Sequence, residues 1–212
     1  MSEIWNKVYS SDASFFGDVP SNFGLNCHEE FKKHGVKKLL ELGCGQGRDT
    51  TFFASNDIDV VAIDSSRVAI DALSKITREK NLTIKPMIHN ASEGIPFNGS
   101  YFDALYSHMF FNMRFTDDQL KYLFAEVNRV LKDGGLNLFS VRSENDAMYK
   151  KGTEVEENIF DINGFEIRFF TKSDLQVILM ATGFTAYKII EAYEEPASLY
   201  WVFARKQKDL NK

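Results

Sequence analysis

The sequence predicts an α/β fold: a mostly parallel sheet of seven strands, covered by helices on both faces and ending in an antiparallel strand pair. Short apolar runs that suit buried strands alternate with amphipathic helical segments between residues 36 and 142. A turn with three glycines joins the first strand to the first helix. Two β-rich runs, 184–192 and 199–204, come last in the sequence. Strands that alternate with helices at this spacing form a parallel sheet with helices packed on both sides.

The first three strands are expected at residues 36–42, 59–64 and 84–89, which are apolar runs bounded by polar or turn-forming residues. The first intervening helix is expected at about residues 48–56. The second helix begins after Ser66, because apolar residues then recur on one helical face.

The fourth and fifth strands are expected at residues 102–107 and 136–141, on either side of the most strongly amphipathic helix in the chain. Thr116 and Gln119 form a capping-box pair that begins this helix. The Asp-Gly-Gly turn at residues 133–135 is expected to end it.

The last helix begins at Thr171, with Asp174 as its capping partner, and ends at Gly183. Only a short loop around Pro196 joins the two β-rich runs that follow. Two adjacent strands with such a short connection can only be antiparallel neighbours.

Two segments do not follow the alternation, although the chain as a whole (1–212) is expected to form a single domain. Residues 1–30 are rich in turn formers and aromatic residues and are predicted to form a short helical cap or lid. The alternative is a plain N-terminal extension packed on the core. Residues 143–168 are acidic and irregular, and are predicted to be an insert near the substrate pocket.

Composition and charge exclude several classes of protein. The 212 residues are 44% hydrophobic and carry a net charge of −5, without a basic run long enough to follow a phosphate backbone. Nucleic acid is therefore not expected as a partner. No signal peptide or apolar run of membrane-spanning length is evident, so no membrane association is expected. Cys27 and Cys44 are the only cysteines, which indicates reduced thiols and a cytoplasmic location, and no metal-ligand spacing is present.

The glycine turn is the most informative stretch. Glu41 lies at the end of the first strand, and Gly43, Gly45 and Gly47 follow two residues apart. Glycines let the backbone turn sharply and approach a ligand closely. The free N–H groups of the next helix then point toward whatever lies over the turn. Asp64 ends the second strand 17 residues beyond Gly47, near the spacing used for ribose recognition in nucleotide-binding βαβ units.

Two kinds of ligand fit such a turn. Dinucleotide-binding sites space their glycines as G-x-G-x-x-G, and the third glycine allows close packing of helix on strand. Here the spacing is G-x-G-x-G, and Arg48 stands where that third glycine would be. The NAD(P)-dependent oxidoreductases therefore remain only as an alternative.

Five segments, in order, resemble the motifs of the class I S-adenosylmethionine-dependent methyltransferases, whose fold is Rossmann-like. The resemblance covers roughly residues 36–142, and the small size and the Gly47-Arg48 step are similar to the tellurite-resistance and related small-molecule methyltransferases. The segments are 41–47 (Glu-Leu-Gly-Cys-Gly-Gln-Gly), 61–64 (Val-Ala-Ile-Asp), 96–97 (Pro-Phe), 102–107 (Phe-Asp-Ala-Leu-Tyr-Ser) and 126–135 (Glu-Val-Asn-Arg-Val-Leu-Lys-Asp-Gly-Gly).

The resemblance implies S-adenosylmethionine as cofactor and a set of residues that hold it. Asp64 would accept from the ribose hydroxyls, Glu41 would lie near the methionine ammonium, and Ser65 and Asn90-Ala91 would border the adenine. Many relatives carry Asp where this chain has Asn90. Each polar residue also has a structural alternative, such as helix capping by Asp64 or Ser65. The full predicted set is Glu41, Gly43, Cys44, Gly45, Gly47, Asp64, Ser65, Asn90, Ala91 and Ser107.

Ser107 and His108 follow the fourth strand, at the edge where open sheets bind ligands. His108 is the candidate catalytic base, and the alternative is a loop histidine packed beside Met109 and Phe110. Methyl transfer from a sulfonium depends mainly on alignment, so a base is needed only for an acceptor that carries a proton.

The acceptor is expected to be a small molecule. The chain lacks the Pro-Pro-aromatic and Pro-Cys motifs of DNA methylases after the fourth strand. The remaining alternative from another class is a non-catalytic module that binds the cofactor. Aromatic and apolar residues could wall an acceptor pocket, and three arginines could bind an anionic acceptor. These residues are Phe110, Phe111, Met113, Phe115, Tyr149, Phe169 and Phe170 for the wall, and Arg114, Arg142 and Arg168 for the anion.

Overall fold

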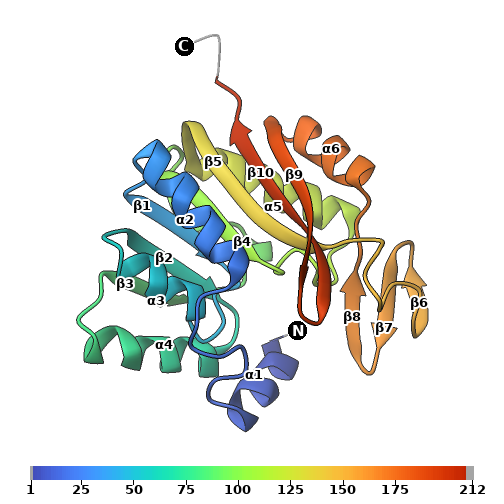
Figure 1. Ribbon diagram of the computed structural model, residues 1–212, viewed down its shortest axis with the longest axis horizontal. Coiled ribbons are helices and arrows are strands. Elements are labelled where there is room, and N and C mark those ends of the chain that lie inside the picture. The colour runs from blue at the N-terminus through green and yellow to red at the C-terminus, as the bar shows by residue number, and fades with distance from the viewer. Residues whose placement is uncertain (1, 209–212) are drawn as a thin grey trace.

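A seven-stranded sheet forms the centre of the computed structural model, which describes residues 2–208 (Figure 1). Met1 of the predicted cap and residues 209–212 lie outside the described part. The strand order is β3-β2-β1-β4-β5-β10-β9. Strands β1 to β5 pair in parallel, and β10 is antiparallel to both β5 and β9. The strands are β1 (Lys38–Leu42), β2 (Asp59–Asp64), β3 (Ile84–Ile88), β4 (Phe102–His108), β5 (Leu131–Arg142), β9 (Phe184–Glu194) and β10 (Ala197–Lys206).

The predicted fold class is confirmed, and the strand order shows where a ligand site would lie. The chain proceeds from β1 outward to β2 and β3, and then returns to place β4 on the other side of β1. Leu39 therefore has Val60 on one side and Ala104 on the other. In open α/β sheets the crevice for ligands forms at this reversal, outside the carboxyl ends of the strands.

Helices cover both faces of the sheet, as predicted. Helices α2 (Asn22–His34), α3 (Arg48–Ala54) and α4 (Arg67–Glu79) pack on one face. Helices α5 (Asp117–Val130) and α6 (Lys172–Ala181) pack on the other. Successive side chains of a strand point to opposite faces, so neighbouring apolar residues of β1 enter two different core clusters. No helix within residues 2–208 has the length and apolarity needed to cross a membrane.

Both predicted capping boxes are confirmed. Thr116 accepts from the backbone N–H of Gln119 at the start of α5, and Gln119 accepts in return from the N–H of Thr116. Thr171 and Asp174 make the same reciprocal pair at α6. These local pairs satisfy N–H groups that lack partners within the helix.

The predicted end of the α5 helix was wrong. The helix ends at Val130, and the Asp-Gly-Gly residues 133–135 lie within β5. Leu131 is fully buried and pairs with Phe102 of β4, so the chain turns into the sheet before the glycines are reached. The register between β4 and β5 shifts just beyond this pair, which accommodates the left-handed Gly134 at φ +74°.

The segment predicted as an irregular insert, 143–168, instead contains a small antiparallel sheet. Its strands are β6 (Thr153–Glu156), β7 (Ile159–Ile162) and β8 (Phe165–Arg168). Asn158, Asn163 and Gly164 supply the positive φ values that the connecting turns require. The strands are hard to recognise in the sequence because acidic residues are frequent in them. Few of their apolar side chains are buried, and these form only a small cluster.

The N-terminal segment contains helix α1 (Ser2–Ser11), which lies below the sheet in Figure 1 and contacts helix α4. Tyr9 is its one buried residue. Helix α2 begins at Asn22, within the predicted cap, but packs directly on the sheet.

We expect Gly47→Ala to destabilise the protein more than Gly164→Ala. Both glycines have similar left-handed φ values, +89° and +85°, so each alanine costs about 1–2 kcal/mol in backbone conformation. A Cβ at Gly47 would also collide with the side chain of Leu73, whereas nothing lies within 4 Å of a Cβ at Gly164. Thermal unfolding should show a further loss of about 1–3 kcal/mol for Gly47→Ala. Equal losses for the two variants would contradict the packing argument.

Candidate active site

The glycine turn folds back on the end of β2. The N–H groups of Gly43 and Cys44 both donate to the carbonyl oxygen of Ile63, at 2.8 and 3.1 Å. Gly43, Gly45 and Gly47 all have positive φ, between 53° and 89°. The backbone is therefore held where side chains at these positions would not fit: a Cβ on Gly43 would lie 2.7 Å from the Phe110 ring.

Asp64 joins this turn to the next one. Its carboxylate accepts from the N–H of Gly45 at 2.9 Å and from the N–H of Ser66 at 2.8 Å. Ser66, rather than Ser65, caps helix α4. Burial raises the pKa of Asp64 against the effect of its backbone hydrogen bonds. Each carboxylate oxygen keeps a lone pair that could accept from a ligand hydroxyl.

Glu41 is buried at the end of β1, where it accepts a hydrogen bond of 2.6 Å from the Thr50 hydroxyl. Burial raises the pKa of Glu41 to about 8, with Asp49 and Asp64 adding to the effect and Thr50 opposing it. The side chain is therefore mostly protonated at neutral pH.

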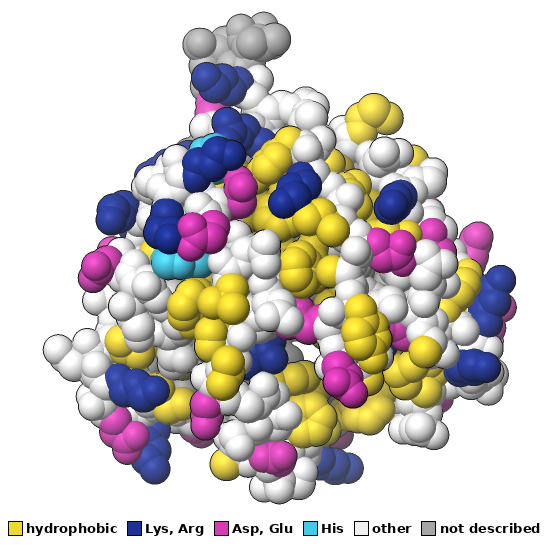
Figure 2. Space-filling view, in the orientation of Figure 1, with side chains coloured by type: hydrophobic (Ala, Val, Ile, Leu, Met, Phe, Trp, Pro, Cys, Tyr) yellow, Lys and Arg dark blue, Asp and Glu magenta, His cyan; other side chains and the backbone are white. Residues whose placement is uncertain are grey.

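Two adjoining cavities lie over the carboxyl ends of the strands. Asp64, Ser65, Asn90 and Ala91 line the first. The second has a volume of about 370 Å³ and is lined by Glu41, Cys44, Gly45, Gly47 and further residues. Gly43 and His108 line both. Figure 2 shows a hollow below the centre of this face, with hydrophobic side chains on its rim. The structure thus brings together every predicted cofactor-binding residue except Ser107.

Ser107 lines neither cavity. It is fully buried, and its hydroxyl has no partner among the described residues. Side chains alternate along β4, so His108 faces the site and Ser107 points to the opposite side of the sheet. The sequence predicts the correct edge of the sheet for Ser107, but it does not show to which face of the sheet the side chain points.

Asn90 is engaged locally. Its side chain caps a short 3₁₀ helix, η1 (Ala91–Glu93), by accepting from the N–H of Ser92 at 3.2 Å. Its amide nitrogen donates to Glu93 at 3.2 Å. The residue is exposed and borders the first cavity, whereas the neighbouring Ala91 is buried.

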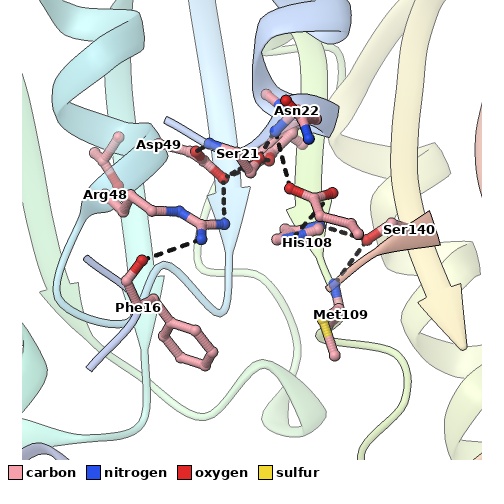
Figure 3. Close-up of polar contacts among 12 residues, drawn as sticks. Phe16, Ser21, Asn22, Arg48, Asp49, His108, Met109 and Ser140 are labelled. Carbon is pink, nitrogen blue, oxygen red and sulfur yellow. Dashed lines mark hydrogen bonds and ion pairs between the residues drawn. The ribbon is translucent and has the colours of Figure 1, made fainter. Parts of the chain in front are cut away.

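His108 is held by Ser140 (Figure 3). The Ser140 Oγ accepts from the N–H of Met109 at 3.0 Å and lies 2.6 Å from Nδ1 of His108. Ser140 and the ring therefore share one hydrogen bond, whose donor depends on which ring nitrogen carries the proton. The Nε2 atom faces Glu194, with 3.9 Å to Oε2. Burial, reinforced by Arg48 and opposed by Asp49, lowers the pKa of His108 to about 4, so the ring is neutral at pH 7.

Asp49 is a site residue that the sequence reasoning missed. Its carboxylate accepts from the N–H of Ser21 at 2.7 Å, from the Ser21 hydroxyl at 2.8 Å and from the Tyr106 hydroxyl at 2.6 Å. Burial alone would raise its pKa, but Arg48, His108 and these hydrogen bonds outweigh burial and lower it. In the sequence Asp49 looks like an ordinary acidic residue in the first turn of a helix.

The N-terminal segment is tied to the glycine turn over these cavities. Gln46 accepts from the N–H of Phe15 at 3.1 Å, and Arg48 donates to the carbonyl oxygen of Phe16 at 3.2 Å (Figure 3). Phe16 lines both cavities, and Trp5 lines the first. The aromatic residues of this segment therefore wall the site.

Of the seven residues predicted to wall an acceptor pocket, three line the first cavity: Phe110, Met113 and Phe115. Phe111 and Phe170 belong to the main core instead. Tyr149 and Phe169 pack with Phe160 beside the small sheet. The sequence pattern does not distinguish aromatic residues that line a cavity at the sheet edge from those that pack in the core.

Comparisons with known proteins show what this chain and its fold are similar to. Residues 39–135 match a family model described as "Methyltransferase domain". An uncharacterized methyltransferase of Synechocystis is 31% identical over 47% of this chain and 44% of its own length. The chain spans less than two-thirds of the length of the curated relatives that it matches, between 36% and 64%.

Two solved structures share the fold. A SAM-dependent methyltransferase of Methanosarcina mazei has a TM-score of 0.74 and 21% identity, over 86% of this chain and 98% of that protein. The 1,6-didemethyltoxoflavin-N1-methyltransferase of Burkholderia thailandensis, with 1,6-didemethyltoxoflavin and S-adenosylhomocysteine bound, has a TM-score of 0.76 and 17% identity over 98% and 87%. Residues 39–135 are thus similar to a methyltransferase domain, and the two structures show that the chain has the fold expected from the resemblance to class I S-adenosylmethionine-dependent methyltransferases.

We expect Glu41→Gln to change how stability depends on pH. A carboxyl whose pKa rises from 4.5 to about 8 on folding stabilises the native state fully below pH 4.5, and that contribution is lost as pH rises through 8. The loss approaches about 1.4 kcal/mol per pH unit inside this window. Glutamine stays neutral, so Glu41→Gln should gain stability relative to the wild type from pH 5 to pH 8, as measured by thermal unfolding.

The exposed Glu79→Gln, at the end of α4, is the matched control and should follow the wild type at every pH. Parallel pH profiles for Glu41→Gln and the wild type would show that Glu41 ionises normally in the folded protein.

Proposed function

We propose that this protein transfers a methyl group from S-adenosylmethionine to a small-molecule acceptor. The observation that carries the proposal is the pairing of two carboxyl groups, the buried Glu41 and the partly buried Asp64, with a glycine turn that exposes backbone at the reversal point of the sheet. A nucleoside without phosphate needs carboxylates and bare backbone, and no lysine or arginine lines the first cavity among the described residues.

The residues present fit the cofactor. Asp64 would accept from the ribose hydroxyls through its free lone pairs, and Asn90 and Ala91 would border the adenine. Glu41 would face the ammonium of the methionine tail, which would draw its carboxyl into the ionised form. Gly43 and Gly45 let Phe110 and Tyr9 pack directly on the backbone of the turn, because a Cβ at either position would collide with that side chain.

The cofactor supplies a methyl group on a sulfonium, which is a good leaving group. What the chain contributes is alignment and exclusion of water, and such positioning can contribute about 7–11 kcal/mol to lowering a barrier. His108 has a pKa lowered to about 4 by burial, so its ring is neutral at pH 7 and is a weak base. An acceptor that is already ionised or an amine would react without a base.

The type of acceptor, the cellular location and the subfamily predicted from the sequence are also part of this proposal. The aromatic N-terminal segment over the cavities supports a small acceptor rather than nucleic acid. Cys27 and Cys44 are buried free thiols, which supports a cytoplasmic location. The closer resemblance to the tellurite-resistance group rests on the Gly47-Arg48 step and stays a prediction.

Two alternatives give different experimental results. A non-catalytic cofactor-binding module would bind S-adenosylhomocysteine but transfer no radiolabelled methyl group to any pool of thiols, amines, carboxylates or metalloid oxyanions. An NAD(P)-dependent oxidoreductase would bind NADH or NADPH in a fluorescence titration. Methyl transfer to any acceptor, without nicotinamide binding, supports the proposed function.

We expect Asp64→Ala to weaken the binding of S-adenosylhomocysteine at least tenfold in calorimetry, because the ribose would lose a charged acceptor that contributes about 1.5–3 kcal/mol. Asp59→Asn is the matched control: Asp59 begins the same strand, is exposed and lines neither cavity. Its affinity should equal that of the wild type. If Asp64→Ala binds as tightly as the wild type, Asp64 only holds the Gly45 and Ser66 turns.

A further inference from the structure

A third cavity lies beside the two that would hold the cofactor. Trp5, Phe15, Phe16 and Phe165 supply flat apolar walls. Phe16 and Met109 line all three cavities, so the third adjoins the other two directly. The walls come from the N-terminal segment on one side and from the small β-sheet on the other.

Of the three arginines that the sequence offers for an anionic acceptor, two are already engaged. Arg114 is exposed and pairs with Glu156 at 3.0 Å and Glu166 at 2.7 Å. Arg168 pairs with Asp117 at 3.0 Å and donates to the carbonyl oxygen of Phe115 at 2.8 Å. Both guanidinium charges are thus paired, and Arg168, whose Nε has no partner among the described residues, lines none of the three cavities.

Arg142 differs because it is nearly buried and only partly satisfied. It ends β5 with 9% of its surface exposed, and it lines both the second and the third cavity. Its Nη1 donates to Asp146 at 2.8 Å. No hydrogen bond joins its Nε or Nη2 to another of the described residues. The guanidinium therefore has donors left for a ligand.

The position of Arg142 is fixed from several sides. Asp146 also accepts from the N–H groups of Ser198 and Met148, both at 2.8 Å, so the carboxylate cannot swing away. The backbone N–H of Arg142 donates to Asn112 at 2.8 Å. A guanidinium held in this way loses little conformational entropy when it binds a ligand.

The charges around the third cavity favour an anion. Its charged lining residues are Arg114, Arg142 and Glu166, and the first and last of these pair with each other. Arg142 is itself paired with Asp146, which does not line this cavity, but only through Nη1, so its Nε and Nη2 are left as cationic donors for a ligand. A guanidinium recognises planar anionic oxygens best, because its N–H groups match a carboxylate geometrically.

We propose that the methyl acceptor is a planar apolar molecule with an anionic oxygen, a carboxylate or phenolate, and that Arg142 binds that oxygen while the aromatic walls of the third cavity hold the ring. This inference rests on the proposed function, since it names the acceptor class of the same site. Arg142 is thereby a binding residue for the acceptor, and Asp146 positions it.

The test uses benzoate as the anionic probe and benzamide as its neutral counterpart of similar shape. Each is titrated by calorimetry into the protein, with and without saturating S-adenosylhomocysteine. Benzoate should bind at least tenfold more tightly than benzamide, because only the carboxylate matches the guanidinium. Trp5 fluorescence should change with benzoate, and Trp5→Phe should abolish that signal. Equal affinities for the two probes would overturn the proposal.

Arg142→Lys keeps the charge beside Asp146 but loses the planar fork, so benzoate affinity should fall about tenfold. Arg142→Met with Asp146→Asn removes the charge pair together, which avoids leaving a buried carboxylate unpaired. Circular dichroism and thermal unfolding check that both variants fold. Arg168→Lys is the matched control, because Arg168 is about as buried as Arg142, is paired with Asp117 and lines none of the three cavities; it should bind benzoate like the wild type.

Unchanged benzoate affinity in both Arg142 variants would overturn the proposal, even if one of them unfolds at a lower temperature. The binding of S-adenosylhomocysteine distinguishes failure of the proposed function from failure of the proposed acceptor class. If it binds and benzoate shows no preference, the acceptor class is wrong and the proposed function stands. If it does not bind, the proposed function fails, and the benzoate titration without it still tests Arg142.

Discussion

The carboxylate of Asp64 holds two neighbouring turns at the sheet edge, since it accepts from the N–H of Gly45 at 2.9 Å and from that of Ser66 at 2.8 Å. The first bond fixes the glycine turn after β1, and the second fixes the start of α4 after β2. Tyr9 of the N-terminal segment then packs against Gly45, where a Cβ would lie 2.8 Å from its hydroxyl. Asp64 therefore lines the first cavity and also fixes the turn on which Tyr9 of the N-terminal segment packs.

Three acidic residues at this edge differ because their surroundings differ. Burial keeps Glu41 protonated at neutral pH. Asp49 stays ionised because Ser21, Tyr106 and Arg48 stabilise its charge. Burial raises the pKa of Asp64, although its backbone N–H donors oppose the effect. The two cavities therefore offer both a neutral carboxyl and an ionised one, and no lysine or arginine of the described residues lines the first, which suits a ligand group that is itself cationic or neutral.

Much of the fold follows from local pattern. The strands, the capping boxes at Thr116 and Thr171 and the glycine turn depend on residues near one another in sequence, so their signals are readable there. The errors have a common origin in long-range packing. The burial of Leu131 against β4 ended α5 early, and pairing among β6, β7 and β8 gave order to a stretch whose acidic residues suggest none.

The sequence by itself determined the sheet, the edge at which a ligand would lie, and most of the residues there, because strand ends and glycine turns place them through covalent connection alone. Only the tertiary structure decided which side chains are available. It turned Ser107 away, gave Asp49 its partners Ser21 and Tyr106, and left Arg142 with free donors while engaging Arg114 and Arg168. The physical reason is that hydrogen-bond satisfaction depends on neighbours far along the chain, which no local pattern records.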